Sequence, residues 1–354
     1  MWSMIKREVR NYCKNPLYWI GIVIIFVMIF QCVSPYLHTH YLAERETIEN
    51  DYPETFRNGD IYEGYVPTAD AERREIWEEQ IREILRTDLE RNAVEADAII
   101  AETQKMDIKT ACNYLENYNF LSAYYYYVNT AYRKGTPEEI NAYIAAKLKE
   151  KPFSYYFSKK FADFAGLHMG FFAALLLSVL YLQDTRKNTY ELLHTKPVSA
   201  GSYLLGKTGG GFVVCLIALA VLNLGYWLLC LVMTKEQGFT VRLTDFLIAT
   251  CLYILPNMLM IVCIYSLISL LFKSPLPAVP LLLLYITYSN MGAYRKDGVY
   301  GYYGKPLAIM VRFPGTFFDT TPPPMVLLNQ VFLILASVVI LLLAILLWKK
   351  RRVS

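Results

Sequence analysis

The chain has 354 residues, of which 55% are hydrophobic and 15% aromatic, and its formal net charge is +4. Soluble domains are usually about 45–50% apolar, and the apolar excess here is concentrated in long runs. The basic residues flank these runs and form no patch interleaved with aromatic residues, which argues against a nucleic-acid-binding protein.

Residues 1–16 are predicted to form an amphipathic helix. Trp2, Ile5, Val9 and Tyr12 recur at helical spacing, and basic residues lie between them. Such a helix lies in the cytoplasmic membrane interface with its apolar face toward lipid. The alternative is a simple cluster of charge that sets the membrane topology.

Six apolar runs approach the roughly 20 residues that a helix needs to cross a bilayer. Backbone groups in hydrocarbon must be hydrogen-bonded within their own segment, so the predicted fold class is an all-α polytopic membrane protein with six transmembrane helices. The first run is too long for the apolar region of a cleaved signal peptide, and we expect a retained span. The runs cover residues 17–36, 161–182, 212–233, 246–272, 275–291 and 326–348, and the fifth is short and interrupted by prolines.

Lys and Arg are unevenly distributed between the two sides of these spans. The segments on the side of both termini carry 13 of them, and the short loops 234–245 and 292–325 on the other side carry 6. By the positive-inside rule, both termini are expected in the cytoplasm.

Residues 37–160 are predicted to be an extracellular, mostly helical domain. They contain 16 Lys and Arg but 23 Asp and Glu, and long loops are translocated largely regardless of their charge. Apolar residues around Trp77 recur at helical spacing, and Thr136-Pro137-Glu138-Glu139 has the pattern of a helix capping box.

This domain is rich in tyrosine, and two interpretations remain open. The rings can form the core and membrane-facing floor of a small domain, since tyrosine suits half-wet positions near lipid headgroups. Alternatively, they line an external ligand surface, whose candidate residues are Tyr114, Tyr118, Tyr124, Tyr125, Tyr126 and Tyr127.

The sequence offers no convincing metal or catalytic centre. His38 and His40 flank Thr39, but a His-x-His pair points both rings the same way only on a strand, and this segment follows a predicted helix. The seven cysteines show no Cys-x-x-Cys spacing, and no Ser, Cys or His has the surroundings of a nucleophile. We therefore predict no metal, no bound cofactor and no enzymatic activity of the chain itself.

The segment Gly201–Thr208 nevertheless fits the phosphate-loop pattern G-x-x-x-x-G-K-[ST]. A working phosphate loop follows a buried strand and begins a helix packed on a sheet. Here the preceding residues do not read as a strand, and the following ones begin an apolar run. We therefore expect ATP and Mg²⁺ to be bound by a partner protein.

Two further features concern the shape of the membrane part. Pro256 in the fourth run predicts a kink, because proline removes a helix hydrogen bond; it either shapes the helix or acts as a hinge. The stretch Pro306–Val311 in the last outer loop is too short to span, and it either dips into the outer leaflet or stays in the loop.

The segment 183–207 resembles a permease subunit of the type-2 ATP-binding-cassette (ABC) exporters. That family carries Gly-Thr-x-Glu, leucine, a proline and Leu-x-Gly-Lys between the second and third spans. This chain has Asn188-Thr189-Tyr190-Glu191 and Leu204-Leu205-Gly206-Lys207, so that asparagine replaces the usual glycine. The basic amino terminus and the six predicted spans extend the resemblance over the membrane part.

The resemblance implies that the 183–207 loop contains a coupling helix that docks on a separate ABC ATPase subunit, and that two permeases, identical or homologous, pair in the membrane lipid. Charged side chains of this loop can form ion pairs with the ATPase, and its leucines can pack against an apolar surface. The alternative is that the charges only set the membrane topology. The implied coupling residues are Arg186, Lys187, Thr189, Glu191, Leu192, Leu193, Lys196 and Pro197.

The predicted function is that of a permease in the cell membrane, of bacterial type, which exports a hydrophobic peptide, a lipopeptide or a lipid-like compound. The alternative is a membrane sensor that does not transport. Its extracellular domain would bind an antibiotic, a peptide or a cell-wall component.

Overall fold

The computed structural model describes residues 1–43, 46, 48–185, 199–294, 300–301 and 304–353. The chain divides into two compact units. Unit 1 consists of residues 1–38, 151–314 and 319–354, and unit 2 consists of residues 39–150 and 315–318.

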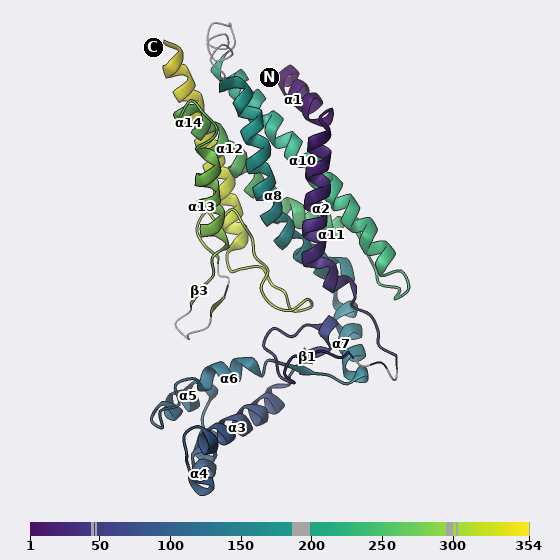
Figure 1. The fold of residues 1–354 in the computed structure, drawn as a ribbon, viewed down its shortest axis with the longest axis vertical. Helices are drawn as coiled ribbons and strands as arrows, with labels where there is room; N and C mark the ends of the chain where they lie inside the picture. Colours follow the sequence, from purple (N-terminus) through teal and green to yellow (C-terminus); the bar gives the residue numbers. More distant parts are fainter. Residues whose placement is uncertain (44–45, 47, 186–198, 295–299, 302–303, 354) are drawn as a thin grey trace. The chain divides into compact units, whose positions relative to one another are not determined.

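Unit 1 is built from helices (Figure 1). A short antiparallel pair, β3 (Ala293–Tyr294) and β4 (Tyr300–Gly301), follows the penultimate helix. The helices are α1 (Trp2–Cys13), α2 (Pro16–Leu37), α8 (Phe153–Thr185), α10 (Ala200–Met233), α11 (Leu243–Tyr253), α12 (Leu255–Leu271), α13 (Ala278–Asn290) and α14 (Val326–Val353).

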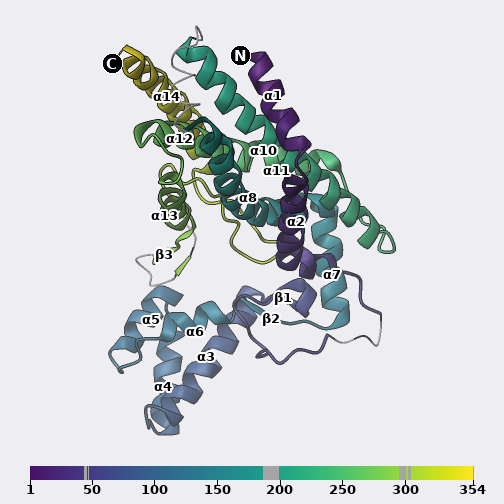
Figure 2. The same cartoon turned by 45° about the horizontal axis from the view of Figure 1, so that its top comes forward.

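Five helical segments are long and apolar enough to cross a membrane: α2, α8, α10, α11 with α12, and α14. These confirm five of the predicted spans. The remaining one is a shorter helix, α13, whose 13 residues extend only about 20 Å at 1.5 Å per residue. The two chain ends lie at the same end of unit 1 in both views (Figures 1 and 2).

Helix boundaries differ from the apolar runs at two places. The second predicted span starts near residue 161, but α8 begins at Phe153; the third starts near residue 212, but α10 begins at Ala200. α10 has 34 residues, about 50 Å of helix against a hydrocarbon core of about 30 Å. Polar turns therefore continue beyond the apolar part of each helix, where hydropathy alone gives no signal.

The fourth span is interrupted as predicted. α11 ends at Tyr253 and α12 begins at Leu255, so the break lies at Ile254, just before Pro256. Proline at the second position of α12 lacks the N–H that would continue the ladder of α11. The stretch 306–311 contains no regular helix, and its residues 308–311 are buried in unit 1.

Tyrosine hydroxyls link neighbouring helices inside unit 1. Tyr18 donates to the carbonyl of Val214 at 2.7 Å, Tyr226 to that of Phe26 at 2.6 Å, and Tyr265 to that of Ala174 at 2.7 Å. These bonds join α2 to α10 and α12 to α8. A hydroxyl away from water needs such a partner, and polar bonds of this kind hold membrane helices together.

Unit 2 is mostly helical, with a two-stranded ribbon in which Tyr65 pairs with Lys134. Its helices pack around Trp77, whose indole N–H donates to the carbonyl of Ala123 at 2.8 Å. The elements are the 3₁₀ helix η1 (Ile61–Glu63), β1 (Tyr65–Pro67), α3 (Asp70–Thr87), α4 (Ala93–Thr103), α5 (Ile108–Glu116), α6 (Ala123–Asn129), β2 (Tyr132–Lys134) and α7 (Pro137–Glu150).

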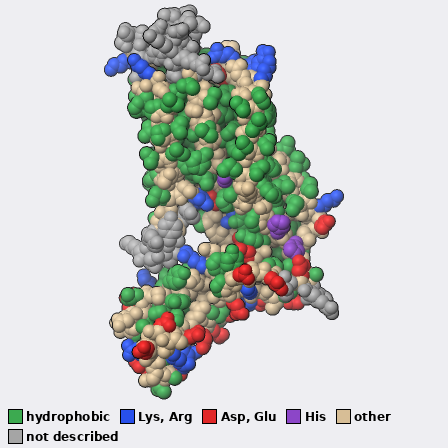
Figure 3. Space-filling model, viewed as in Figure 1, with side chains coloured by type: hydrophobic (Ala, Val, Ile, Leu, Met, Phe, Trp, Pro, Cys, Tyr) green, Lys and Arg blue, Asp and Glu red, His purple; other side chains and the backbone are tan. Residues whose placement is uncertain are grey.

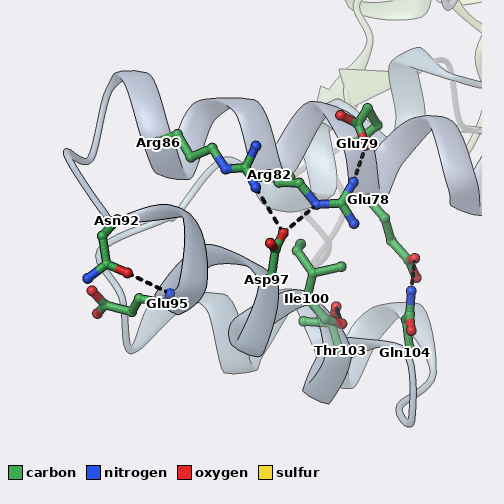
Figure 4. A network of polar contacts seen from close by, with 10 residues as sticks. All are labelled: Glu78, Glu79, Arg82, Arg86, Asn92, Glu95, Asp97, Ile100, Thr103 and Gln104. Carbon is green, nitrogen blue, oxygen red and sulfur yellow. Dashed lines mark hydrogen bonds and ion pairs between the residues drawn. The ribbon is translucent and has the colours of Figure 1, made fainter.

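The predicted helix cap in unit 2 is confirmed. α7 has the predicted capping box, in which the N–H of Thr136 donates to Glu139 at 2.9 Å and the N–H of Glu139 donates to the Thr136 hydroxyl at 3.4 Å. α3 and α4 are joined by charged side chains at their surface, where Arg82 and Arg86 both bind Asp97 (Figure 4).

A four-residue segment from the loop before α14, residues 315–318, also belongs to unit 2, although it is distant in sequence. The N–H of Phe317 donates to both carboxylate oxygens of Asp60, at 3.0 and 2.9 Å, and the Thr316 hydroxyl donates to the Tyr132 hydroxyl at 3.0 Å. Nothing in the local sequence of 315–318 predicts these contacts.

Candidate functional site

Helix α1 packs on a face of α10 that is made of glycines. A Cβ atom on Gly206 would lie 3.0 Å from the Cβ of Met4, and one on Gly210 would lie 3.0 Å from the Cβ of Glu8. Such distances are too short for a comfortable contact between side chains, so α1 can approach α10 this closely because these positions are glycine. Small residues serve the same purpose in other membrane helix pairs.

A buried ion pair lies in this packed face. Lys207 Nζ donates to Glu8 Oε1 at 3.2 Å, and the two side chains are only 1% and 3% exposed. Arg7, which is largely exposed, contacts the same carboxylate oxygen at 3.0 Å. Removing one partner of a buried pair is strongly destabilising, so this pair holds α1 in a fixed position on α10.

This geometry explains the phosphate-loop pattern. Gly206, Lys207 and Thr208 lie inside α10, where their backbone N–H groups serve the helix, instead of forming a loop that wraps an anion. Thr208 exchanges a hydrogen bond of 2.8 Å with Ser266 of α12. The pattern Gly-Lys-Thr therefore reflects helix packing. The glycine allows α1 to approach closely, the lysine pairs with Glu8, and the threonine bonds to α12.

The apolar face of α1 packs against other helices of unit 1, whereas the predicted interfacial helix would place this face against lipid. Ile5 and Tyr12 were expected to face lipid, but Ile5 lies beside Gly209 and the Tyr12 hydroxyl donates to the carbonyl of Leu176 at 3.0 Å. Glu8 was not predicted to form a structural contact. The sequence held one indication of its role, because Glu8 is the single acidic residue in 1–16 and shares a helical face with Met4 and Tyr12.

The first turns of α10 also contact the last turns of α14. The rings of Tyr203 and Trp348 stack with centroids 4.2 Å apart, within a small core that includes Leu204, Leu270 and Ala344. α1, α10, α12 and α14 thus meet at the end of unit 1 that holds both chain ends, and Lys and Arg gather at this end as well (Figure 3). We call this group of four packed helix ends the α10 platform.

The predicted coupling residues Arg186, Lys187, Thr189, Glu191, Leu192, Leu193, Lys196 and Pro197 lie outside the described residues. The chain places them between the end of α8 at Thr185 and the start of α10 at Ala200. Ser199 caps α10 by accepting a hydrogen bond from the N–H of Ser202 at 3.2 Å. The segment therefore leads directly into the α10 platform.

A second group of buried charges lies in the first turns of α8. Lys159 donates to the carbonyl of Thr320 at 3.2 Å and Lys160 to that of Phe313 at 3.3 Å. Asp163 forms an ion pair with Arg312 and accepts from the N–H of Phe313 at 3.0 Å. The two lysines were assigned to the external domain from sequence, but they belong to unit 1.

Most of the candidate tyrosines take part in the packing of unit 2. Five of them pack against the helical core, and Tyr125 is 60% exposed. The hydroxyls of Tyr114 and Tyr118 lie 3.0 Å apart, and this hydrogen bond raises the pKa of Tyr114 to about 12. Whether these rings also bind an external ligand remains a prediction.

Among the described residues, no group of three His, Cys, Asp or Glu side chains is close enough to hold a metal ion. His40 instead contacts Glu46 at 2.9 Å. This hydrogen bond lowers the pKa of the Glu46 carboxyl.

The comparisons with known proteins identify the family. Residues 2–351 match the family model described as ABC-2 family transporter protein. No curated protein and no solved structure matches the sequence. The match covers nearly the whole chain and agrees with its set of long apolar helices, so this multi-pass membrane protein belongs to the ABC-2 transporter family as a permease.

Proposed function

We propose that this permease is driven by a separate ABC ATPase subunit, which docks on the 183–207 loop, and that it exports a hydrophobic peptide, a lipopeptide or a lipid-like compound. The observation that carries the proposal is the α10 platform. The loop enters α10 at Ala200, and the next turns of α10 are tied to α1 by the Glu8–Lys207 pair and to α14 by the Tyr203–Trp348 stack.

This packing offers a mechanical route from an ATPase to the membrane. Packed helix ends move as a group, because dense cores do not deform continuously. A push on the loop would therefore displace α10 together with α1 and α14. The exposed side chains of α14 along its apolar part are hydrophobic, as in a helix that faces lipid.

The orientation follows from charge. The end with the α10 platform carries the basic residues of α1 and the run Lys349–Arg352, and the positive-inside rule places such an end in the cytoplasm. An ATPase docks there, and unit 2 is then extracellular. Two permeases, identical or homologous, would form the complete pathway, with ATP and Mg²⁺ bound by the partner subunit.

The test is reconstitution of the permease with its ATPase in vesicles. Glu191→Ala and Leu192→Ala should lower substrate-stimulated ATP hydrolysis at least tenfold or abolish copurification of the ATPase. Lys235→Ala, at an exposed position in the loop after α10, is the control and should have no effect. ATP hydrolysis by the purified chain alone, or normal coupling in both loop variants, would overturn the proposal.

A second candidate function is a sensor that does not transport, and one observation favours it. Unit 2 has its own core and incorporates Gly315–Phe318, a segment that precedes α14 along the chain. Ligand binding to unit 2 would then act on a membrane helix through this segment.

Replacing residues 45–150 by a short Gly/Ser linker separates the two functions. A transporter keeps basal, ATP-dependent substrate movement, whereas a sensor loses its entire response. Movement of substrate by the shortened chain therefore excludes a purely sensory role.

A further inference from the structure

A cavity of about 450 Å³ lies in unit 1, between the end of α13, residues 304–312 and the start of α14. Its size falls within the range of roughly 300–1,000 Å³ that is typical of small-molecule sites. Its wall is mainly apolar and includes Met291, Pro306, Ala308, Met310, Val326 and Phe332. An alkyl chain fits such a wall.

The charged side chains on the wall are all cationic. Arg312 and Lys305 line the cavity, and the described lining residues include no Asp or Glu. Lys305 is positioned by its bond to the carbonyl of Tyr288 at 3.1 Å, and Arg312 by Asp163 and the Asn290 side chain. Asp163 offsets much of the charge of Arg312, so Lys305, which is bonded to a neutral carbonyl, is the main cation of the wall. A positioned lysine and the guanidinium beside an apolar wall favour a ligand that is both anionic and hydrophobic.

One of the lining residues, Asn329, also carries a hydrogen-bond acceptor that is unsatisfied within the described part of the chain. Its amide N–H donates to the carbonyl of Ala308 at 2.9 Å. The amide oxygen of Asn329 is buried and has no hydrogen-bond partner among the described residues. Buried polar atoms are normally satisfied, so a ligand with a hydroxyl donor suits this position.

The start of α14 connects the cavity with the lipid-facing surface. Leu328 and Phe332 line the cavity and are 42% and 48% exposed. Their neighbours Leu327 and Val331 are also exposed. A ligand can therefore enter from the surrounding bilayer without crossing water.

We propose that this cavity binds an anionic phospholipid from the adjacent leaflet. The phosphate lies near Arg312 and Lys305, a headgroup hydroxyl donates to Asn329, and one acyl chain lies against the apolar wall. The site belongs to the chain itself, so this proposal does not depend on an ATPase partner or on the exported compound.

The test measures lipid binding to the purified full-length chain in detergent by native mass spectrometry, without ATPase. The probes are phosphatidylglycerol, which is anionic and carries hydroxyl groups, and phosphatidylcholine, which has no net charge. The chain should bind phosphatidylglycerol about tenfold more tightly. Equal affinity for the two lipids would overturn the proposal.

Two variants with matched controls locate the site. Leu328→Trp should fill the cavity and weaken phosphatidylglycerol binding at least tenfold, whereas Leu327→Trp, at a neighbouring exposed position outside the lining, should not. Lys305→Gln should reduce the preference for phosphatidylglycerol about fivefold, the effect of one basic residue near an anionic lipid, whereas Lys235→Gln should leave it unchanged. Unaltered binding in Leu328→Trp, or an unaltered preference in Lys305→Gln, contradicts this site.

Discussion

An ion pair in unit 1 and an ion pair in unit 2 lie in opposite environments. In unit 1 the side chains of Glu8 and Lys207 are 3% and 1% exposed, whereas in unit 2 those of Arg86 and Asp97 are 40% and 56% exposed. A buried charge that loses its partner costs several kcal/mol, and an exposed pair contributes about 0.2–1 kcal/mol. The loss of Glu8 should therefore be costly in unit 1, whereas the loss of Asp97 should be tolerated in unit 2.

The largest expected effect is that of Glu8→Leu, which leaves Lys207 buried without its carboxylate. We expect a loss of about 3–5 kcal/mol in local stability, measured as faster hydrogen exchange of α1 and the first turns of α10. Glu8→Leu combined with Lys207→Met should recover most of this loss, since neither charge remains buried. If Glu8→Leu alone leaves exchange unchanged, the pair does not hold α1 on α10.

The next effect concerns the glycine face in the same place. In Gly210→Leu the new side chain begins 3.0 Å from the Cβ of Glu8 and must displace α1. Overpacking of this kind costs about 1–3 kcal/mol, visible as a lower melting temperature of the detergent-solubilised chain. Gly201→Leu in the same helix is the control, because its Cβ would meet nothing within 4 Å. Similar melting temperatures for the two variants would contradict the predicted packing.

A smaller effect is expected from pH at the base of α7. Arg133 binds both oxygens of Glu139, at 2.9 and 2.7 Å, and lowers the pKa of Glu139 from 4.5 to about 2. A lowered carboxyl pKa stabilises the fold above the unfolded value, and this contribution is lost as pH falls from about 4.5 through 2. Hydrogen exchange of residues 137–150, corrected for its intrinsic pH dependence, should accelerate over this window.

Glu139→Gln is the control for that titration. It removes the titrating group, so α7 should exchange faster already at pH 7 and show less acceleration on acidification. An identical pH profile in both chains would assign the acid sensitivity to other carboxyl groups.

The smallest expected effect is that of Asp97→Asn in unit 2. It removes the carboxylate that Arg82 and Arg86 share across α3 and α4 (Figure 4). Because all three side chains are exposed to solvent to some degree, the loss should be about 1 kcal/mol or less, measured by hydrogen exchange of α4. A loss of stability as large as that of Glu8→Leu would remove the contrast between the buried ion pair of unit 1 and the exposed one of unit 2.

The sequence predicted features that depend on neighbouring residues. Apolar runs locate α2 and α14 within a few residues, Pro256 predicts the break at Ile254, and Thr136 with Glu139 predicts the cap of α7. The family was also recognisable, because its motif lies in one continuous segment. Each of these signals occupies a short window of the chain.

The features that were missed depend on contacts between distant residues. Glu8 meets Lys207 across 199 positions, and Lys159 meets the carbonyl of Thr320 across 161. Local composition marks Lys159 and Lys160 as solvent-exposed, since lysine is seldom buried unless it is paired. Their carbonyl partners lie in the loop before α14, and the sequence of this loop has no pattern that predicts these contacts.

The shortness of α13 has a consequence for the bilayer around it. This helix is about 10 Å shorter than an average hydrocarbon core, and a bilayer accommodates such a mismatch by thinning locally. We therefore expect the two headgroup layers to approach each other beside α13, next to the cavity at its end. A polar group that moves between leaflets along this flank would then cross less hydrocarbon than it would beside the longer helices.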